Sequence, residues 1–83
     1  MASVIRKCLK LIIADLYHDI YGRNPKRSWY VLGKLVKDNY PKIRPTLLQW
    51  QEKGYITLIE DDDNIFTVHP DKLPPKDVLL NSI

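Results

Sequence analysis

The sequence predicts an α+β domain with three helices and a C-terminal two-stranded β-hairpin. Two observations lead to this fold class. Apolar residues recur at helical spacing over residues 4–21 and again within residues 29–53, and two short segments of alternating apolar residues follow Gly54. The 83 residues have room for one domain, which we place at residues 1–70, with a C-terminal tail at residues 71–83.

The first predicted helix begins after Ser3, whose hydroxyl group can cap it. Gly22 is expected to end it, because glycine adopts the left-handed backbone of a helix C-terminus at little cost. Cys8 lies on the apolar face and is expected to be an inert buried thiol. Pairs of apolar neighbours four residues apart form that face: Val4/Ile5, Cys8/Leu9, Ile12/Ile13, Leu16/Tyr17 and Ile20/Tyr21.

A second helix is predicted over residues 29–39, after a loop GRNPKR at residues 22–27. Ser28 can cap this helix. Gly33 weakens its interior, and several β-preferring residues leave open a short strand at residues 28–31 before the helix begins. Tyr40 precedes a proline, which disfavours helical backbone, so the helix is expected to end there. The expected inward residues are Leu32, Leu35 and Val36.

The third predicted helix runs from about residue 44 or 45 to residue 53, because Pro45 suits a first helical turn. Leu47 and Trp50 are three residues apart and therefore share the face that anchors this helix. Gly54 is its expected end. The segments YITLIE and NIFTVHP then alternate as strands, and Asp63-Asn64 between them tolerates the backbone of a tight turn.

Charge is divided unevenly along the chain. The net charge is +3, but residues 1–59 carry eleven Lys and Arg against four Asp and Glu, a balance of +7. Residues 60–83 carry two against six, a balance of −4. The first part is suited to a polyanion, and the second part is not.

The order of these elements over residues 3–70 resembles the winged helix-turn-helix superfamily. The most specific segment is LLQWQEKGYI, residues 47–56, which has a leucine, polar residues, a large apolar residue, a charged pair, a glycine and an apolar strand start. The matching residues are Leu47, Trp50, Glu52, Lys53, Gly54, Tyr55 and Ile56. The compact form looks like small archaeal or archaeal-viral members.

The resemblance implies binding to double-stranded DNA and a role as a small transcriptional regulator. In this superfamily the third helix enters the major groove. The residues that would face the bases are Lys42, Arg44, Thr46 and Gln49. Those that would contact phosphates are Arg23, Lys26, Arg27, Ser28 and Lys53. Arg23, Lys26 and Arg27 also fit an ordinary solvated loop.

The tip of the hairpin departs from the DNA-binding pattern. Glu60, Asp61, Asp62 and Asp63 form an acidic tip, and clustered carboxylates repel a phosphate backbone. Three explanations are open. The tip points away from the DNA, or it contacts a basic partner protein, or it is a solvated turn whose charges discourage pairing between strand edges.

The tail has two interpretations. Val78, Leu79 and Leu80 fold back onto the first helix, or they form an exposed apolar stretch that a second copy or another protein covers. The alternative function is therefore a protein-interaction module or accessory subunit of a nucleic-acid-processing complex, which binds through the acidic tip and the tail. A homodimer fits either function, since a two-fold pair matches two half-sites on DNA.

Several other kinds of site are not expected. His18 and His69 have no Cys or His at metal-ligand spacing, so neither a metal nor another cofactor is predicted. The sequence has no nucleophile or phosphate-loop motif, so we do not expect an enzyme. Cys8 is the only cysteine, which excludes an intrachain disulfide and favours a cytoplasmic location. No apolar run is long enough to span a membrane.

Overall fold

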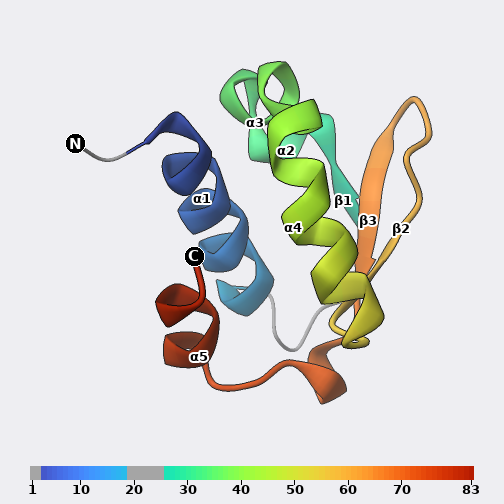
Figure 1. Cartoon of the computed structure of the whole chain (residues 1–83). Coiled ribbons are helices and arrows are strands. Elements are labelled where there is room, and N and C mark those ends of the chain that lie inside the picture. Colours follow the sequence, from blue (N-terminus) through green and yellow to red (C-terminus); the bar gives the residue numbers. More distant parts are fainter. Residues whose placement is uncertain (1–2, 19–25) are drawn as a thin grey trace.

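The computed structural model of the chain describes residues 3–18 and 26–83 (Figure 1). These residues form helices and a three-stranded antiparallel sheet, which confirms the predicted α+β class. The elements are α1 (Val4–His18), β1 (Lys26–Ser28), α2 (Trp29–Leu32), α3 (Lys34–Asp38), α4 (Tyr40–Glu52), β2 (Ile56–Leu58), β3 (Asn64–Val68), the 3₁₀ helix η1 (Pro70–Lys72) and α5 (Lys76–Asn81).

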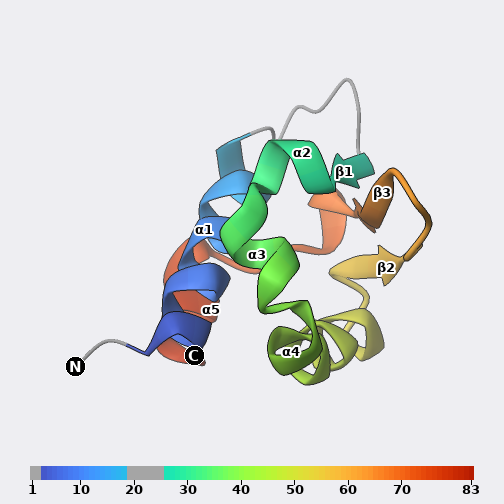
Figure 2. The same cartoon turned by 90° about the horizontal axis from the view of Figure 1, so that it is seen from above.

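The helices and the sheet enclose a single core. Helix α1 lies between α5 on one side and the group α2, α3 and α4 on the other, and the sheet is at the opposite end of the molecule from α5 (Figures 1 and 2). The buried apolar side chains are Cys8, Leu9, Ile12, Ile13 and Leu16 of α1, Leu32, Val36, Ile43, Leu47 and Trp50 of α2 to α4, Ile56, Ile65, Phe66 and Val68 of the hairpin, and Leu79 of α5.

The sheet has three strands, so the prediction of a two-stranded hairpin is wrong in this respect. Its order is β1-β3-β2, and both pairings are antiparallel. Strand β1 pairs Lys26 with Thr67 and Arg27 with Phe66, and an irregularity follows before Ser28 pairs with Asn64. The three residues of β1, Lys-Arg-Ser, show no alternation of apolar side chains that would predict a strand. They pair with β3 through their backbone groups.

Helix α1 follows the predicted pattern. Ser3 caps it as expected, since its Oγ accepts a hydrogen bond of 3.0 Å from the backbone N–H of Arg6. The buried stripe runs from Cys8 to Leu16, whereas Val4 is 51% exposed at the start of the helix. The predicted end at Gly22 lies outside the described residues.

The predicted second helix is two helices, because Gly33 interrupts it. Gly33 has φ of +90° and ψ of 170°, a backbone conformation that glycine adopts and other residues avoid. The cap prediction is confirmed, since Ser28 Oγ accepts a 3.2 Å hydrogen bond from Val31 N–H. Leu32 and Val36 are buried as predicted, but the change of direction leaves Leu35 36% exposed.

Helix α4 begins at Tyr40, four or five residues earlier than predicted, and contains both prolines. Pro41 lies in the first turn, where its missing N–H group costs nothing, so the helix begins there and Pro45 lies in its interior. The extra turn buries Ile43, which the sequence analysis did not place in the core. Leu47 and Trp50 are buried as predicted.

Gly54 ends α4 as predicted. Its φ is +87°, its N–H donates to Gln51 C=O at 3.0 Å, and Tyr55 N–H donates to Trp50 C=O at 3.0 Å. This pair of bonds is the Schellman motif, which satisfies the last carbonyls of a helix. The chain therefore reverses directly from α4 into β2.

The tail folds back onto α1, which decides between its two interpretations. Helix α5 packs against α1, and Leu79 is buried between them. The Tyr17 hydroxyl donates to the Pro74 carbonyl and ties the segment before α5 to α1. Val78 is on the outer side and is 49% exposed. Among the described residues, no helix combines the length and hydropathy needed to cross a bilayer.

Replacing Gly54 by alanine is expected to lower the free energy of unfolding by about 1–2 kcal/mol. The backbone conformation disfavours a Cβ atom, which would also lie 3.3 Å from Lys72 Cδ. Urea denaturation measures the loss. Gly54→Asn is the matched control, because asparagine tolerates the left-handed conformation, and its loss should be smaller. Equal losses in the two variants would argue against this account.

Candidate nucleic-acid interface

Helix α4 buries one side and exposes two others. Ile43, Leu47 and Trp50 form the buried side. Of the residues predicted to face DNA bases, Lys42 and Gln49 are exposed and Thr46 is partly exposed. These three and exposed Lys53 follow each other at spacings of four, three and four residues, so they lie along one side of the helix.

Arg44 lies on a different side of α4 from the other predicted base-reading residues. It is two residues from Lys42, which corresponds to about 200° around the helix axis. This side faces the hairpin. Arg44 Nε donates to Glu60 Oε1 at 2.6 Å, and Arg44 Nη2 donates to Glu60 Oε2 at 3.3 Å. The structure therefore separates Arg44 from Lys42, Thr46 and Gln49 and pairs it with the acidic tip.

Glu60 is held by two side chains of α4. The Tyr40 hydroxyl also donates to Glu60 Oε1, at 2.5 Å. The hydrogen bonds from Arg44 and then Tyr40 lower the pKa of Glu60. Desolvation, and then the bond to Glu60, raise the pKa of the Tyr40 hydroxyl. Glu60 is thus a structural carboxylate that joins the hairpin to the first two turns of α4.

Asp61 organises the backbone of the acidic tip. Its Oδ1 accepts hydrogen bonds from Asp63 N–H at 2.8 Å and from Asn64 N–H at 2.5 Å. These bonds, the one from Asn64 first, lower the pKa of the Asp61 carboxyl group. The positive φ of the turn falls on Glu60, at +53°, and not on Asp63-Asn64 as predicted. Two of the four acidic side chains therefore have structural roles.

Trp29 fixes the acidic tip to the helices. Its indole Nε1 donates to Asp61 C=O at 3.2 Å, and its backbone N–H donates to Asp63 C=O at 3.3 Å. The indole packs edge-on against Tyr40, with 4.9 Å between ring centroids. Trp29 is thus a structural contact between the hairpin, α2 and α4.

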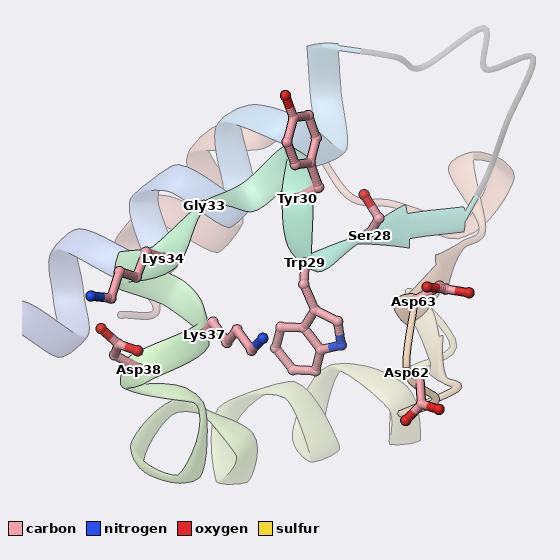
Figure 3. A pocket seen from close by; sticks show the side chains of 9 residues that line it. All are labelled: Ser28, Trp29, Tyr30, Gly33, Lys34, Lys37, Asp38, Asp62 and Asp63. Atoms are coloured by element: carbon pink, nitrogen blue, oxygen red, sulfur yellow. The ribbon is translucent and has the colours of Figure 1, made fainter.

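An open groove lies between the helices and the acidic tip. Figure 3 places the Trp29 indole between Lys37 of α3 and the tip, with Tyr30 pointing away from it. Lys34, Lys37 and Asp38 lie on one side of the groove, and Asp62 and Asp63 lie on the other. Tyr30 is 95% exposed. With two lysines and three carboxylates along it, the groove does not favour an anionic small molecule.

The basic residues around the start of β1 that were predicted to contact phosphates are not all exposed to solvent. Arg27 is 4% exposed, and its Nε forms an ion pair with Asp15 of α1. A guanidinium inside the domain is not presented to a phosphate, so the structure does not favour the predicted phosphate contact of Arg27. Lys26 is exposed, and Ser28 uses its hydroxyl group to cap α2. Arg23 lies outside the described residues.

Two exposed lysines were missed by the sequence analysis. Lys34 and Lys37 lie on α3, just before α4, and both are exposed. Their spacing of three residues places them on neighbouring positions of the helix surface. The glycine before Lys34 was the available signal, because a break at Gly33 turns this segment into a separate, largely exposed helix.

Comparison of the chain with models of protein families, with characterised proteins and with solved structures gives no match. Within residues 3–18 and 26–83, no group of His, Cys, Asp and Glu side chains is arranged to hold a metal ion. Cys8 is buried, and desolvation raises the pKa of its thiol.

The contact between Glu60 and α4 is expected to weaken in acid. Because the pKa of Glu60 is lowered in the folded protein, ionised Glu60 stabilises the fold, and this contribution is lost as the pH falls through the lowered pKa. The difference in free energy of unfolding between wild type and Glu60→Gln should be largest near neutral pH and shrink below about pH 4. Urea titrations across pH measure it, and a difference that does not change with pH is the contrary result.

Removal of the buried guanidinium is expected to destabilise the fold. Arg27→Met should lower the free energy of unfolding by about 3 kcal/mol, because it takes the cation away from the partly buried Asp15 carboxylate. Lys26→Met, at the exposed neighbouring position, is the control and should cost less than about 1 kcal/mol. Chemical denaturation of both variants tests this. Similar small losses would mean that the ion pair contributes little.

Proposed function

We propose that this protein binds double-stranded DNA as a small winged helix-turn-helix regulator, with α4 directed at the major groove. The observation that carries this proposal is the division of α4 into an apolar side and a polar side. Ile43, Leu47 and Trp50 anchor the helix, while Lys42 and Gln49 are exposed on another side. Lysine donates to guanine, and glutamine pairs with adenine.

The order of the elements supports the winged-helix assignment. Helices α3 and α4 are joined by a short turn at Asn39, and the β2–β3 hairpin follows α4 directly after Gly54. Strand β1 pairs with β3 and so attaches the hairpin to the start of α2. The hairpin is therefore beside α4, as a wing is beside its recognition helix.

The charges of the described surface also support DNA binding. Lys34 and Lys37 of α3 precede Lys42 along the chain, and all three are exposed. Glu60 opposes DNA less than the sequence implies, because Arg44 pairs with it. Asp61 binds its own turn, and among the described residues the side chains of Asp62 and Asp63 have no hydrogen bond or ion pair of these kinds.

The alternative of a protein-interaction module has less support. It depended on an available tail and four available carboxylates. Leu79 is buried against α1, and Glu60 and Asp61 take part in contacts within the domain. Tyr30 and Val31 on α2 are exposed side chains with apolar surface, at 95% and 63% exposed.

Titration of the protein with a mixed-sequence DNA duplex over a range of salt concentrations tests the proposal. Binding should weaken steeply as the salt concentration rises, because lysine contacts release counterions from DNA. The far-ultraviolet circular dichroism spectrum, recorded in the same buffers, establishes that the protein is folded. Absence of binding by folded protein at low salt would refute the proposal.

Single substitutions locate the surface. Lys42→Ala should weaken binding by about 1–3 kcal/mol, because it removes a donor to a base edge. Lys76→Ala is the charge-matched control, since this exposed lysine lies on α5, which packs against α1. If the two variants lose the same affinity, α4 does not form the contact surface.

A further inference from the structure

We propose that Glu60 is a positioning residue for Arg44, and that the pair presents the remaining guanidinium donors of Arg44 to two acceptor atoms on DNA. This inference rests on the proposed function. It assigns a role to the residue that most opposes DNA binding by its charge. Four observations carry it: the geometry of the pair, the exposure of Arg44, the contacts of Glu60 and the backbone conformation of Glu60.

The pairing occupies only one edge of the guanidinium group. Glu60 accepts a hydrogen bond from Arg44 Nε at 2.6 Å and another from Arg44 Nη2 at 3.3 Å. Arginine has five N–H donors in a fixed plane, so three remain, on Nη1 and Nη2. One from each of these nitrogens forms a second parallel fork, which suits two acceptors side by side.

The Arg44 side chain remains accessible. The Arg44 side chain is 45% exposed although it is paired, and the Glu60 side chain is 32% exposed. A contact that served only the stability of the fold would gain little at such a site, because exposed ion pairs contribute about 0–1 kcal/mol. An arginine with one edge paired and a side chain that is still 45% exposed is instead suited to recognition.

Glu60 is itself held in place, as a positioning residue must be. The Tyr40 hydroxyl donates to the same oxygen that accepts from Arg44 Nε. The next residue, Asp61, is also fixed: its Oδ1 accepts hydrogen bonds from two backbone N–H groups, and its C=O accepts one from the Trp29 indole. Fixing Glu60 removes rotational freedom from Arg44 before DNA arrives, which lowers the entropy lost on binding.

The backbone at Glu60 is unusual for a glutamate. Its φ of +53° is in the left-handed region, where glycine or asparagine is the ordinary residue. It is the one residue other than glycine with positive φ in the described part of the chain. This conformation costs stability. The position therefore has a carboxylate although the backbone alone would favour glycine.

Two features of DNA offer a matching pair of acceptors. Guanine presents O6 and N7 in the major groove, and a phosphate group presents two oxygens. Because Arg44 faces the hairpin and not the side of Lys42 and Gln49, a phosphate beside the groove is the acceptor that this geometry favours. The Arg44–Glu60 pair has no net charge, so its contribution comes from directed hydrogen bonds more than from attraction to the polyanion. The alternative role for Glu60 is competition with DNA for Arg44, which predicts effects of the opposite sign.

Four variants separate these roles: Arg44→Ala, Glu60→Ala, the double variant, and Asp62→Ala. Asp62 is the matched control, because it is an exposed carboxylate of the same tip and its removal changes the charge equally. The probe is a pool of duplex DNA with a randomised central segment, from which wild type and variants each select bound molecules. Affinities are then measured for the duplex that wild type selects and for a mixed-sequence duplex.

We expect Arg44→Ala and Glu60→Ala each to weaken binding to the selected duplex by about tenfold, while Asp62→Ala binds as tightly as wild type or more tightly. In the double variant, removal of Glu60 should have no further weakening effect. Loss of preference at one guanine in both selections identifies a base contact. An equal loss on all duplexes identifies a phosphate contact.

Opposite results overturn the inference. If Glu60→Ala binds more tightly than Asp62→Ala does, Glu60 competes with DNA for Arg44. If Arg44→Ala binds like wild type, Arg44 makes no contact, although salt-dependent binding by the wild type would still support the proposed function. If the folded wild type binds no duplex, both proposals fail together.

A conservative variant guards against misfolding of the tip. Glu60→Gln retains an oxygen that can accept from Tyr40 and from Arg44 Nε but loses the charge, so it should recover part of the lost affinity. In nuclear magnetic resonance spectra, the Arg44 Nε–H signal should exchange slowly in wild type and rapidly in Glu60→Ala. Rapid exchange in the wild type would contradict the fixed pair without any use of DNA.

Discussion

Burial of one side of α4 between α1 and the sheet determines where the other side chains of this helix lie. Ile43, Leu47 and Trp50 repeat at spacings of four and three residues and have almost no exposed surface. With this side fixed, helical geometry directs Lys42 and Gln49 to one outer side and Arg44 to the other. The hairpin then meets the Arg44 side, where Gln51 Oε1 also accepts a 2.8 Å bond from Leu58 N–H.

The two oppositely charged parts of the chain meet at this junction. The +7 and −4 segments divide between residues 59 and 60, and the first acidic residue of the second segment pairs with an arginine of the first. Part of the opposite charge of the two segments is therefore paired within the domain. Charge that looks unsuited to DNA in the sequence is used to hold a basic side chain and to shape a turn.

Much of the fold could be predicted because its signals are local. The cap at Ser3, the stop at Gly54 and the anchors Leu47 and Trp50 depend on neighbouring residues, and the structure has each of them. The third strand and the buried Arg27 could not be predicted in the same way. Both depend on partners far along the chain, Phe66 and Asp15, which no local pattern identifies. The start of α4 was misjudged because two prolines compete for the first turn.

The candidate site was predictable to a similar degree. The exposure of Lys42 and Gln49 follows from the helical repeat, whereas the pairing of Arg44 with Glu60 depends on how the hairpin turns after Gly54. Lys34 and Lys37 were missed because Gly33 was expected only to weaken a continuous helix. In the structure it ends one helix and begins another in a different direction.

The return of α5 to α1 has a consequence for the order of folding. Leu79 and the segment at Pro74 contact a helix formed by residues 4–18, so this contact closes a loop that spans most of the chain. Closing a long loop costs conformational entropy before the contact it allows is formed. Docking of α5 onto α1 is therefore expected to be a slow step of folding. During synthesis, the side of α1 that α5 covers therefore has no intramolecular partner until residues 76–81 have been made.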